Sequence, residues 1–157
     1  MDLEQQIQTL IKNAPQDGNT PKIVEAIAPG LKLLAEQLKH WQYYILQTSS
    51  QNWVLTTLIS KSGVEKRVIY AFPNLKDASL SISEDNIVAV PIPTIHILFQ
   101  MIAIQPLDSL IFFEKAGDLT TATEVKREDV QKLINVYLRQ YQASSTSNPS
   151  KIPPDIT

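Results

Sequence analysis

Residues 41–72, WQYYILQTSSQNWVLTTLISKSGVEKRVIYAF, decide the fold class of this 157-residue chain. Aromatic and β-branched residues, which favour strands, predominate in three runs: residues 41–48, 53–60 and 65–72. The segments between them, SSQN and KSGV, are polar or contain glycine, as turns do. The stretch therefore predicts an antiparallel meander of three strands.

Two helices are predicted before the meander, because apolar residues recur there every three or four positions. The first stripe ends before Pro15, and the second follows Thr20, which can cap a helix that has Pro21 in its first turn. The stripes consist of Leu3, Ile7, Leu10 and Ile11, and of Val24, Ile27, Leu31, Leu34 and Leu38. Pro29-Gly30 interrupts the second stripe, so we expect a kink or two abutting helices.

The second half of the chain predicts more strands and two more helices. A strand pair is expected at residues 79–83 and 87–92, and a helix from Ile95 to about Ala103 is apolar nearly all round, as buried helices are. A hairpin of residues 110–114 and 120–125 is followed by a closing helix from Arg127 to about Tyr141. This order predicts an α+β fold with a mostly antiparallel sheet, N-terminal helices, a buried central helix and a C-terminal helix.

The chain is expected to form one domain, residues 1–141, followed by a tail. Residues 142–157 are rich in Ser, Thr, Asn and Pro, and their only larger apolar residues are Ile152 and Ile156. Such a segment buries too little apolar surface to offset its ordering entropy. We therefore predict that the tail is disordered.

Composition narrows the choice of partners and location. A net charge of −2 provides no general attraction to nucleic acid or to an anionic membrane. Residues 86–107 carry no charged side chain, but Pro91, Pro93 and Pro106 divide them, which favours a buried strand and helix over a membrane span. The first residues lack the basic start and apolar run of a secretory signal, so we expect a cytoplasmic protein.

Features of catalysis are sparse in this sequence. There is no cysteine, and the four glycines lie too far apart to form a phosphate-binding loop. The only histidines, His40 and His96, have no Asp, Glu or His beside them at metal-ligand spacing. We therefore expect a protein that is not an enzyme and that uses neither a metal nor another cofactor.

The predicted meander is apolar on both faces. Trp41, Tyr43 and Ile45 point one way along the first strand, whereas Tyr44 and Leu46 point the other way. A sheet with one solvated face alternates more cleanly. Either helices cover both faces, or one face is left for a partner, and the sequence favours neither alternative.

The element order from about Thr20 to Tyr141 resembles that of type III secretion chaperones and their YbjN-like relatives. The resemblance rests on element order, because no diagnostic motif is present, and it implies a small, acidic, non-enzymatic chaperone that binds an extended segment of another protein. Many such proteins dimerise. The length, acidity and N-terminal helix also resemble those of cyanobacterial carboxysome assembly chaperones, which implies a shell protein's C-terminal extension as the partner.

Large aromatic residues of the meander are the candidates for partner binding, because such side chains are common anchors of peptide-binding sites. We single out Trp53, Tyr44 and Tyr70, although a place in the core is the commoner role for each of them. An alternative function is single-stranded nucleic-acid binding. It rests on Lys61, Lys66 and Arg67, which lie near strand aromatics in the sequence.

Overall fold

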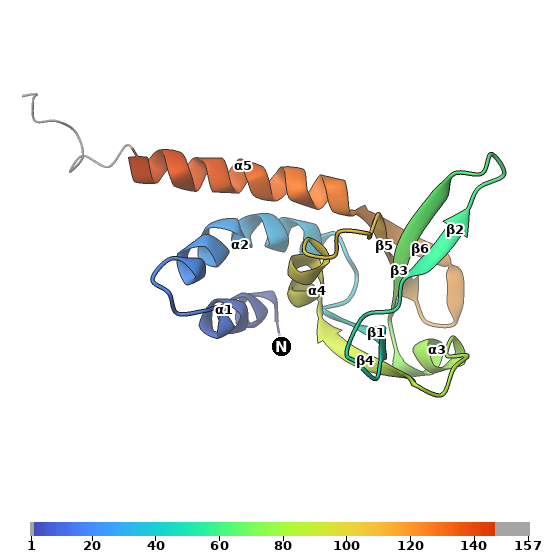
Figure 1. Cartoon of the computed structure of the whole chain (residues 1–157). Helices are drawn as coiled ribbons and strands as arrows, with labels where there is room; N and C mark the ends of the chain where they lie inside the picture. Colours follow the sequence, from blue (N-terminus) through green and yellow to red (C-terminus); the bar gives the residue numbers. More distant parts are fainter. Residues whose placement is uncertain (1, 147–157) are drawn as a thin grey trace, which may run out of the picture.

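The computed structural model describes residues 2–146 and confirms the α+β class. Helices lie mostly to one side of a sheet, and α5 runs along the outer side of α2 (Figure 1). In chain order the elements are α1 (Leu3–Asn13), α2 (Thr20–Glu36), β1 (Gln42–Thr48), β2 (Thr56–Ile59), β3 (Glu65–Phe72), α3 (Leu75–Leu80), β4 (Ile87–Pro93), α4 (Thr94–Met101), β5 (Ser109–Lys115), β6 (Asp118–Lys126) and α5 (Arg127–Thr146).

The sheet is mostly antiparallel, in the order β4-β1-β3-β5-β6, and only β3 and β5 are parallel. The strand predicted at residues 53–60 pairs with both of its predicted neighbours, because Trp53 and Val54 pair with Gln47 and Leu46 of β1 and Thr56–Ile59 pair with β3. The meander is incomplete in one respect, because β1 also pairs directly with β3. Val68 of β3 pairs with Thr56 of β2 and also with Ser109 of β5, so β2 lies on the β1 side of β3. Since β1 pairs only with the last residues of β3, two short strands share one edge of a long strand.

The predicted strand at residues 79–83 is wrong, since residues 79 and 80 end the short helix α3 and residues 81–83 form no strand. Asn74 caps this helix, because its side-chain oxygen accepts from the Asp77 amide at 2.7 Å. A side-chain cap with an acidic residue in the first turn stabilises a helix start, and here it prevails over the weak alternation of the segment. The second strand of the predicted pair exists as β4, and it pairs with β1 along its whole length.

The helical layer follows the sequence prediction closely. α2 is one helix from Thr20 to Glu36 rather than two, and Pro29 lies on its exposed side. Its N-cap is Asn19, so Thr20 is the first helical residue rather than the cap. The predicted central helix is α4, whose Ile95, Ile97, Leu98 and Met101 are fully buried.

The closing helix α5 is longer than predicted and ends at Thr146. Residues 142–146, which we expected in the tail, are therefore helical, and residues 147–157 lie outside the described part of the chain. No helix within residues 2–146 is long and apolar enough to cross a membrane.

The two faces of the sheet are covered very differently. The main core lies between one face and helices α1, α2, α4 and α5, and it contains the buried strand residues Tyr43, Ile45, Ile69, Leu110 and Phe112. A small second cluster on the other face consists of Phe72, Ala78 and Phe113, with half-buried residues such as Tyr44 and Tyr70 packed around it. Helices thus cover one face, and the short α3 covers only part of the other.

Candidate protein-binding site

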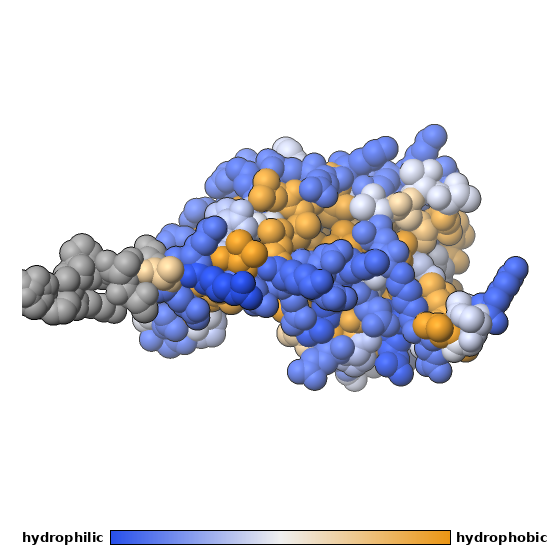
Figure 2. All heavy atoms as spheres, turned by 90° about the horizontal axis from the view of Figure 1, so that it is seen from above, coloured by the Kyte–Doolittle hydropathy of each residue, from blue (hydrophilic) through white to orange (hydrophobic). Residues whose placement is uncertain are grey.

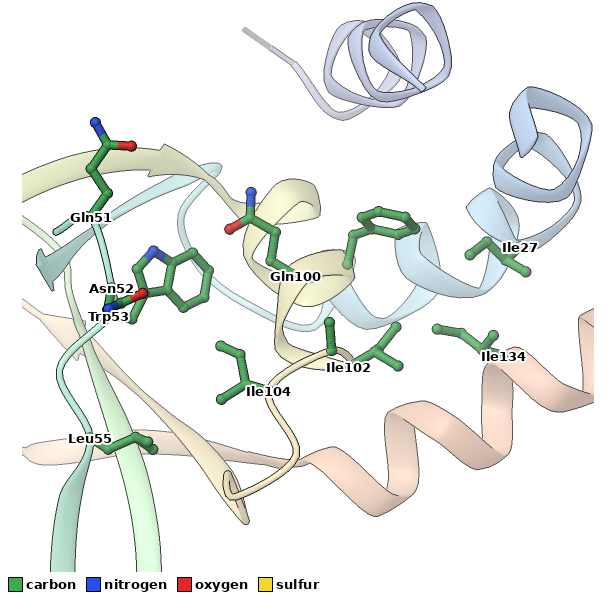
Figure 3. A pocket seen from close by; sticks show the side chains of 11 residues that line it. Ile27, Gln51, Asn52, Trp53, Leu55, Gln100, Ile102, Ile104 and Ile134 are labelled. Carbon is green, nitrogen blue, oxygen red and sulfur yellow. The ribbon is translucent and has the colours of Figure 1, made fainter. Parts of the chain in front are cut away.

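An apolar groove of about 700 Å³ lies on the helix-covered side of the molecule. Ile27 and Ile134 lie at one end of it, Trp53 and Leu55 at the other, and Ile102 and Ile104 between them (Figure 3). The remaining lining residues are Gln51, Asn52, Phe99, Gln100 and Ala103. None of the lining side chains that the structure describes is charged, so the groove suits an apolar ligand.

The loop between β1 and β2 places Trp53 in this groove. Gln51 has a φ of 66°, and the turn is closed by the Gln51 amide, which donates to Thr48 O, and by the Thr48 amide, which donates to Asn52 O, each at 2.9 Å. The chain then returns beside β1, where Trp53 forms an isolated bridge with Gln47. The indole projects from this loop toward Gln100 of α4 (Figure 3).

The central part of the groove is formed where α4 ends, and Arg127 holds this segment in place. Its Nε and Nη2 donate to the Ile102 carbonyl oxygen at 2.9 and 2.5 Å. A cation suits the carbonyl end of a helix, because the last carbonyls lack amide partners and carry partial negative charge. The Arg127 amide also donates to Asp108 O at 2.9 Å, and the Asp108 carboxylate accepts from the Arg67 amide at 2.8 Å. The segment between α4 and β5 is thus tied to β3 and to α5.

The groove continues into an unpaired strand edge. Leu55 precedes β2, and β2 pairs only with β3 among the described strands. The hairpin of β2 and β3 projects beyond the rest of the sheet (Figure 1). Its tip is closed by Gly63, whose φ of +85° favours glycine. Leu58, Ile59 and Val64 are exposed on this arm.

The free backbone groups of β2 can be located from its register. The Ser60 amide donates to Val64 O at 2.9 Å, so these two residues form a hydrogen-bonded pair. Hydrogen-bonded and non-hydrogen-bonded pairs alternate in an antiparallel ladder, and Ile59 and Thr57 are therefore non-hydrogen-bonded opposite β3. The backbone groups of Thr57 and Ile59 consequently point away from the sheet, toward an incoming strand.

The other two edges of the sheet are less suited to strand addition. β4 carries Pro91 and Pro93 at alternate positions, and proline has no amide hydrogen to donate. β6 contains the exposed Glu124 and ends at Lys126, and charged edge residues disfavour pairing with another chain. β2 contains neither a proline nor a charge.

The structure does not bring the three predicted binding residues together. Trp53 packs against the main core on the helix side and lines the apolar groove. Tyr44 and Tyr70 belong to the second cluster on the opposite face, where Tyr70 stacks on Phe113 with ring centroids 5.5 Å apart. Trp53 is thus the one predicted residue in the groove.

Tyr70 lines a second, smaller cavity of about 420 Å³ on that opposite face. The cavity lies between the sheet and the segment that follows α3, including Ile82 and Glu84. Asp77 holds α3 in place, because its Oδ2 accepts from the Gly117 amide of the β5–β6 turn at 2.8 Å. This cavity is bounded by the loop that follows α3 and by the start of β2 at Thr56, so it does not reach the free edge at Thr57 and Ile59.

The predicted nucleic-acid site is not assembled on one surface. Trp53 and Tyr70 belong to clusters on different faces of the sheet. Lys66 forms an ion pair with Glu124, which holds the pKa of that carboxyl below its usual value, helped by the Ser109 hydroxyl at 2.6 Å. Neither the groove that Trp53 lines nor the cavity that Tyr70 lines has a lysine or arginine among its described lining residues.

The two histidines make backbone contacts. His40 Nε2 lies 2.8 Å from Glu114 O, and His96 Nε2 lies 3.1 Å from Gln6 O. Both side chains are half-buried. Within residues 2–146 no three His, Asp or Glu side chains are grouped so that they could hold a metal ion.

A buried polar network underlies the start of β1, and the sequence did not reveal it. Glu114 is only 5% exposed, and its carboxylate accepts from the Tyr43 hydroxyl, from the Thr123 hydroxyl at 3.1 Å and from the Lys39 amide at 3.3 Å. Burial, followed by the hydrogen bond to Glu114, raises the pKa of Tyr43 far above its usual value. The network joins β1, β5 and β6 and thereby fixes the sheet on which the groove is built.

Neither a protein-family model nor a curated protein matches this chain.

Proposed function

We propose that this chain is a non-enzymatic protein-binding module, an assembly chaperone or adaptor, that binds an extended segment of a partner protein. The observation that supports it best is the uncharged apolar groove, which continues at Leu55 into the unpaired edge of β2. Figure 2, which views the molecule from the α5 side, shows apolar atoms gathered beside the hydrophilic band that runs along α5. Apolar surface is therefore open to solvent next to this helix.

The partner segment would bind in two ways at once. Its backbone would pair with the outward groups of Thr57 and Ile59, which is the strand-addition mode of peptide recognition. Its apolar side chains, which lie on alternate positions of an extended chain, would then enter the groove at Trp53. A volume of about 700 Å³ lies within the usual range for ligand sites.

A peptide accounts for both features better than other ligand classes do. A small apolar molecule could fill the groove, but it would leave the β2 edge unused. A single-stranded nucleic acid needs cations along its backbone, and the lining residues provide none. The resemblance to carboxysome assembly chaperones makes the C-terminal extension of a carboxysome shell protein the first partner to test.

The role of the groove in partner binding is tested by replacing a tryptophan inside it and one outside it with alanine. Binding of a fluorescent shell-protein C-terminal peptide is measured by anisotropy for the wild type and for Trp53→Ala and Trp41→Ala. Trp41 is the matched control, because its side chain is 55% exposed and does not line the groove. We expect Trp53→Ala to weaken binding more than tenfold, which is about 1.4 kcal/mol, and Trp41→Ala to leave it unchanged.

The strand edge is tested by Thr57→Pro. Proline removes an amide that points away from β3, so the hairpin should persist while strand addition is lost. Thr57→Val is the control, because valine keeps the amide and favours strands. Circular dichroism and unfolding curves establish that each variant is folded.

Two results would contradict the proposal. If every folded variant binds the peptide as the wild type does, neither the groove nor the β2 edge is the binding site. If the wild type binds no such peptide but retains single-stranded nucleic acid at physiological salt, the chaperone function is wrong.

A further inference from the structure

One end of the groove lies beside α5, and α5 leads into residues 147–157. Ile134 of α5 lines the groove together with Ile27, opposite the end that Trp53 and Leu55 form (Figure 3). A segment that follows α5 and turns back along the helix therefore meets the Ile134 end of the groove first.

The length of this segment matches the distance that it must cover. Thr146 is the twelfth residue after Ile134 along α5, which is a distance of about 18 Å at a rise of about 1.5 Å per residue. An extended chain covers about 3.3 Å per residue, so residues 147–152 span about 20 Å. If the segment turns back along α5, its length is therefore sufficient to bring Ile152 to the Ile134 end, with residues 153–156 left over for the groove.

The chemistry of residues 152–156, IPPDI, suits the groove. Ile152 and Ile156 flank Pro153, Pro154 and Asp155, and prolines dock on aromatic side chains, which Phe99 and Trp53 supply in the groove. A proline-rich segment adopts an extended conformation with no internal hydrogen bonds, so its carbonyls are free to accept from side-chain amides. Gln51, Asn52 and Gln100 supply such amides at the groove.

We propose that residues 152–156 of this chain occupy the apolar groove as an intramolecular competitor of the partner's segment. This inference rests on the proposed function, because it assigns a regulatory occupant to the same groove. The prolines cannot donate to β2, so the competitor takes the groove and leaves the strand edge free. A partner able to use both parts displaces it.

Tethering makes even weak docking effective. A short flexible linker gives an effective concentration on the order of 1 mM. A segment whose dissociation constant in trans is about 0.1 mM would then fill about nine-tenths of the grooves. The partner's apparent affinity would fall about tenfold, because only the unfilled fraction is competent to bind.

The docking of residues 152–156 is tested in the full chain with two double variants, one that removes the apolar side chains and one that serves as a control. Ile152→Ser with Ile156→Ser removes the apolar anchors, and Ser147→Ala with Ser150→Ala is the control in the same segment. The readout is the indole ¹H–¹⁵N signal of Trp53, identified by its persistence in Trp41→Phe. We expect the signal to move in the isoleucine variant only. A synthetic peptide of residues 147–157, added to that variant, should return it toward the wild-type position.

Binding of the shell-protein peptide separates this inference from the proposed function. We expect the isoleucine variant to bind that peptide about tenfold more tightly than the wild type. If both bind it equally and the Trp53 signal is unchanged, the competitor is refuted while the proposed function stands. If the Trp53 signal moves as expected but no partner peptide binds, the docked segment is supported and the proposed function fails.

Discussion

The hydrogen bond between Tyr43 and Glu114 provides the sharpest test of the structure. Tyr43 is fully buried, and Tyr43→Phe removes only its hydroxyl, which leaves the buried Glu114 carboxylate with one donor fewer. Hydrogen bonds to charged groups contribute about 1.5–3 kcal/mol, so we expect the free energy of unfolding at pH 7 to fall by about that amount. Urea unfolding measures this change.

The pH dependence separates this hydrogen bond from a simple packing effect. The pKa of Tyr43 is raised in the folded protein, whereas in the unfolded chain tyrosine titrates at about 10. The stabilising effect of Tyr43 is therefore complete below pH 10 and is lost as the pH rises further, by up to about 1.4 kcal/mol per pH unit. Tyr43→Phe should remove this part of the alkaline decline.

A double-mutant cycle completes the test. Because Glu114→Gln replaces the carboxylate acceptor with a neutral amide oxygen and so weakens the hydrogen bond, we expect Tyr43→Phe to cost less in that background, with a coupling energy of about 0.5–3 kcal/mol. Additive effects, together with an alkaline decline in Tyr43→Phe parallel to that of the wild type, would refute the assigned hydrogen bond.

Three other substitutions test the packing. Gly30→Ala would place a methyl group 2.9 Å from the Tyr137 ring, so it should destabilise the wild type. In the Tyr137→Ala background, the same substitution should raise the free energy of unfolding by about 0.5–1 kcal/mol, as urea unfolding can show. Destabilisation in both backgrounds would contradict this contact. Leu98→Ala should cost about 2–5 kcal/mol in the same assay, because Leu98 is fully buried, and a near-neutral result would mean that α4 is misplaced. Asp77→Ala should speed hydrogen exchange of the Gly117 amide, since that amide loses its acceptor; unchanged exchange would show that Asp77 does not hold the turn.

Local patterns predicted most elements of this fold but not their pairing. The spacing of Val24, Ile27 and Leu31 identified α2, because an amphipathic helix depends on nearby residues only. The position of β2 depends on which residues of β3 remain free once β1 and β5 have paired, and no local pattern contains that information. α3 was missed although Asn74 and Asp77 supplied a capping signal.

The candidate site was predicted only in part, for a related reason. Trp53 was singled out as a large aromatic residue, and it lines the groove. Tyr44 was singled out on the same grounds, but its place on the strand turns it to the other face. Ile102 and Ile104 gave no usable signal, because residues at the end of an apolar helix look like core in the sequence. Only the fold shows that they border a groove.

The parallel pairing of β3 with β5 also affects how the chain folds while the ribosome synthesises it. Val68 pairs with Ser109, which is synthesised about forty residues later. Until β5 has been synthesised, residues 68–71 of β3 have one edge whose backbone groups are unpaired. Apolar strands with such an edge associate with other chains. We therefore expect nascent chains arrested before Ser109 to be captured by general chaperones more strongly than chains extended past Lys115, which a pull-down of arrested ribosomes would measure.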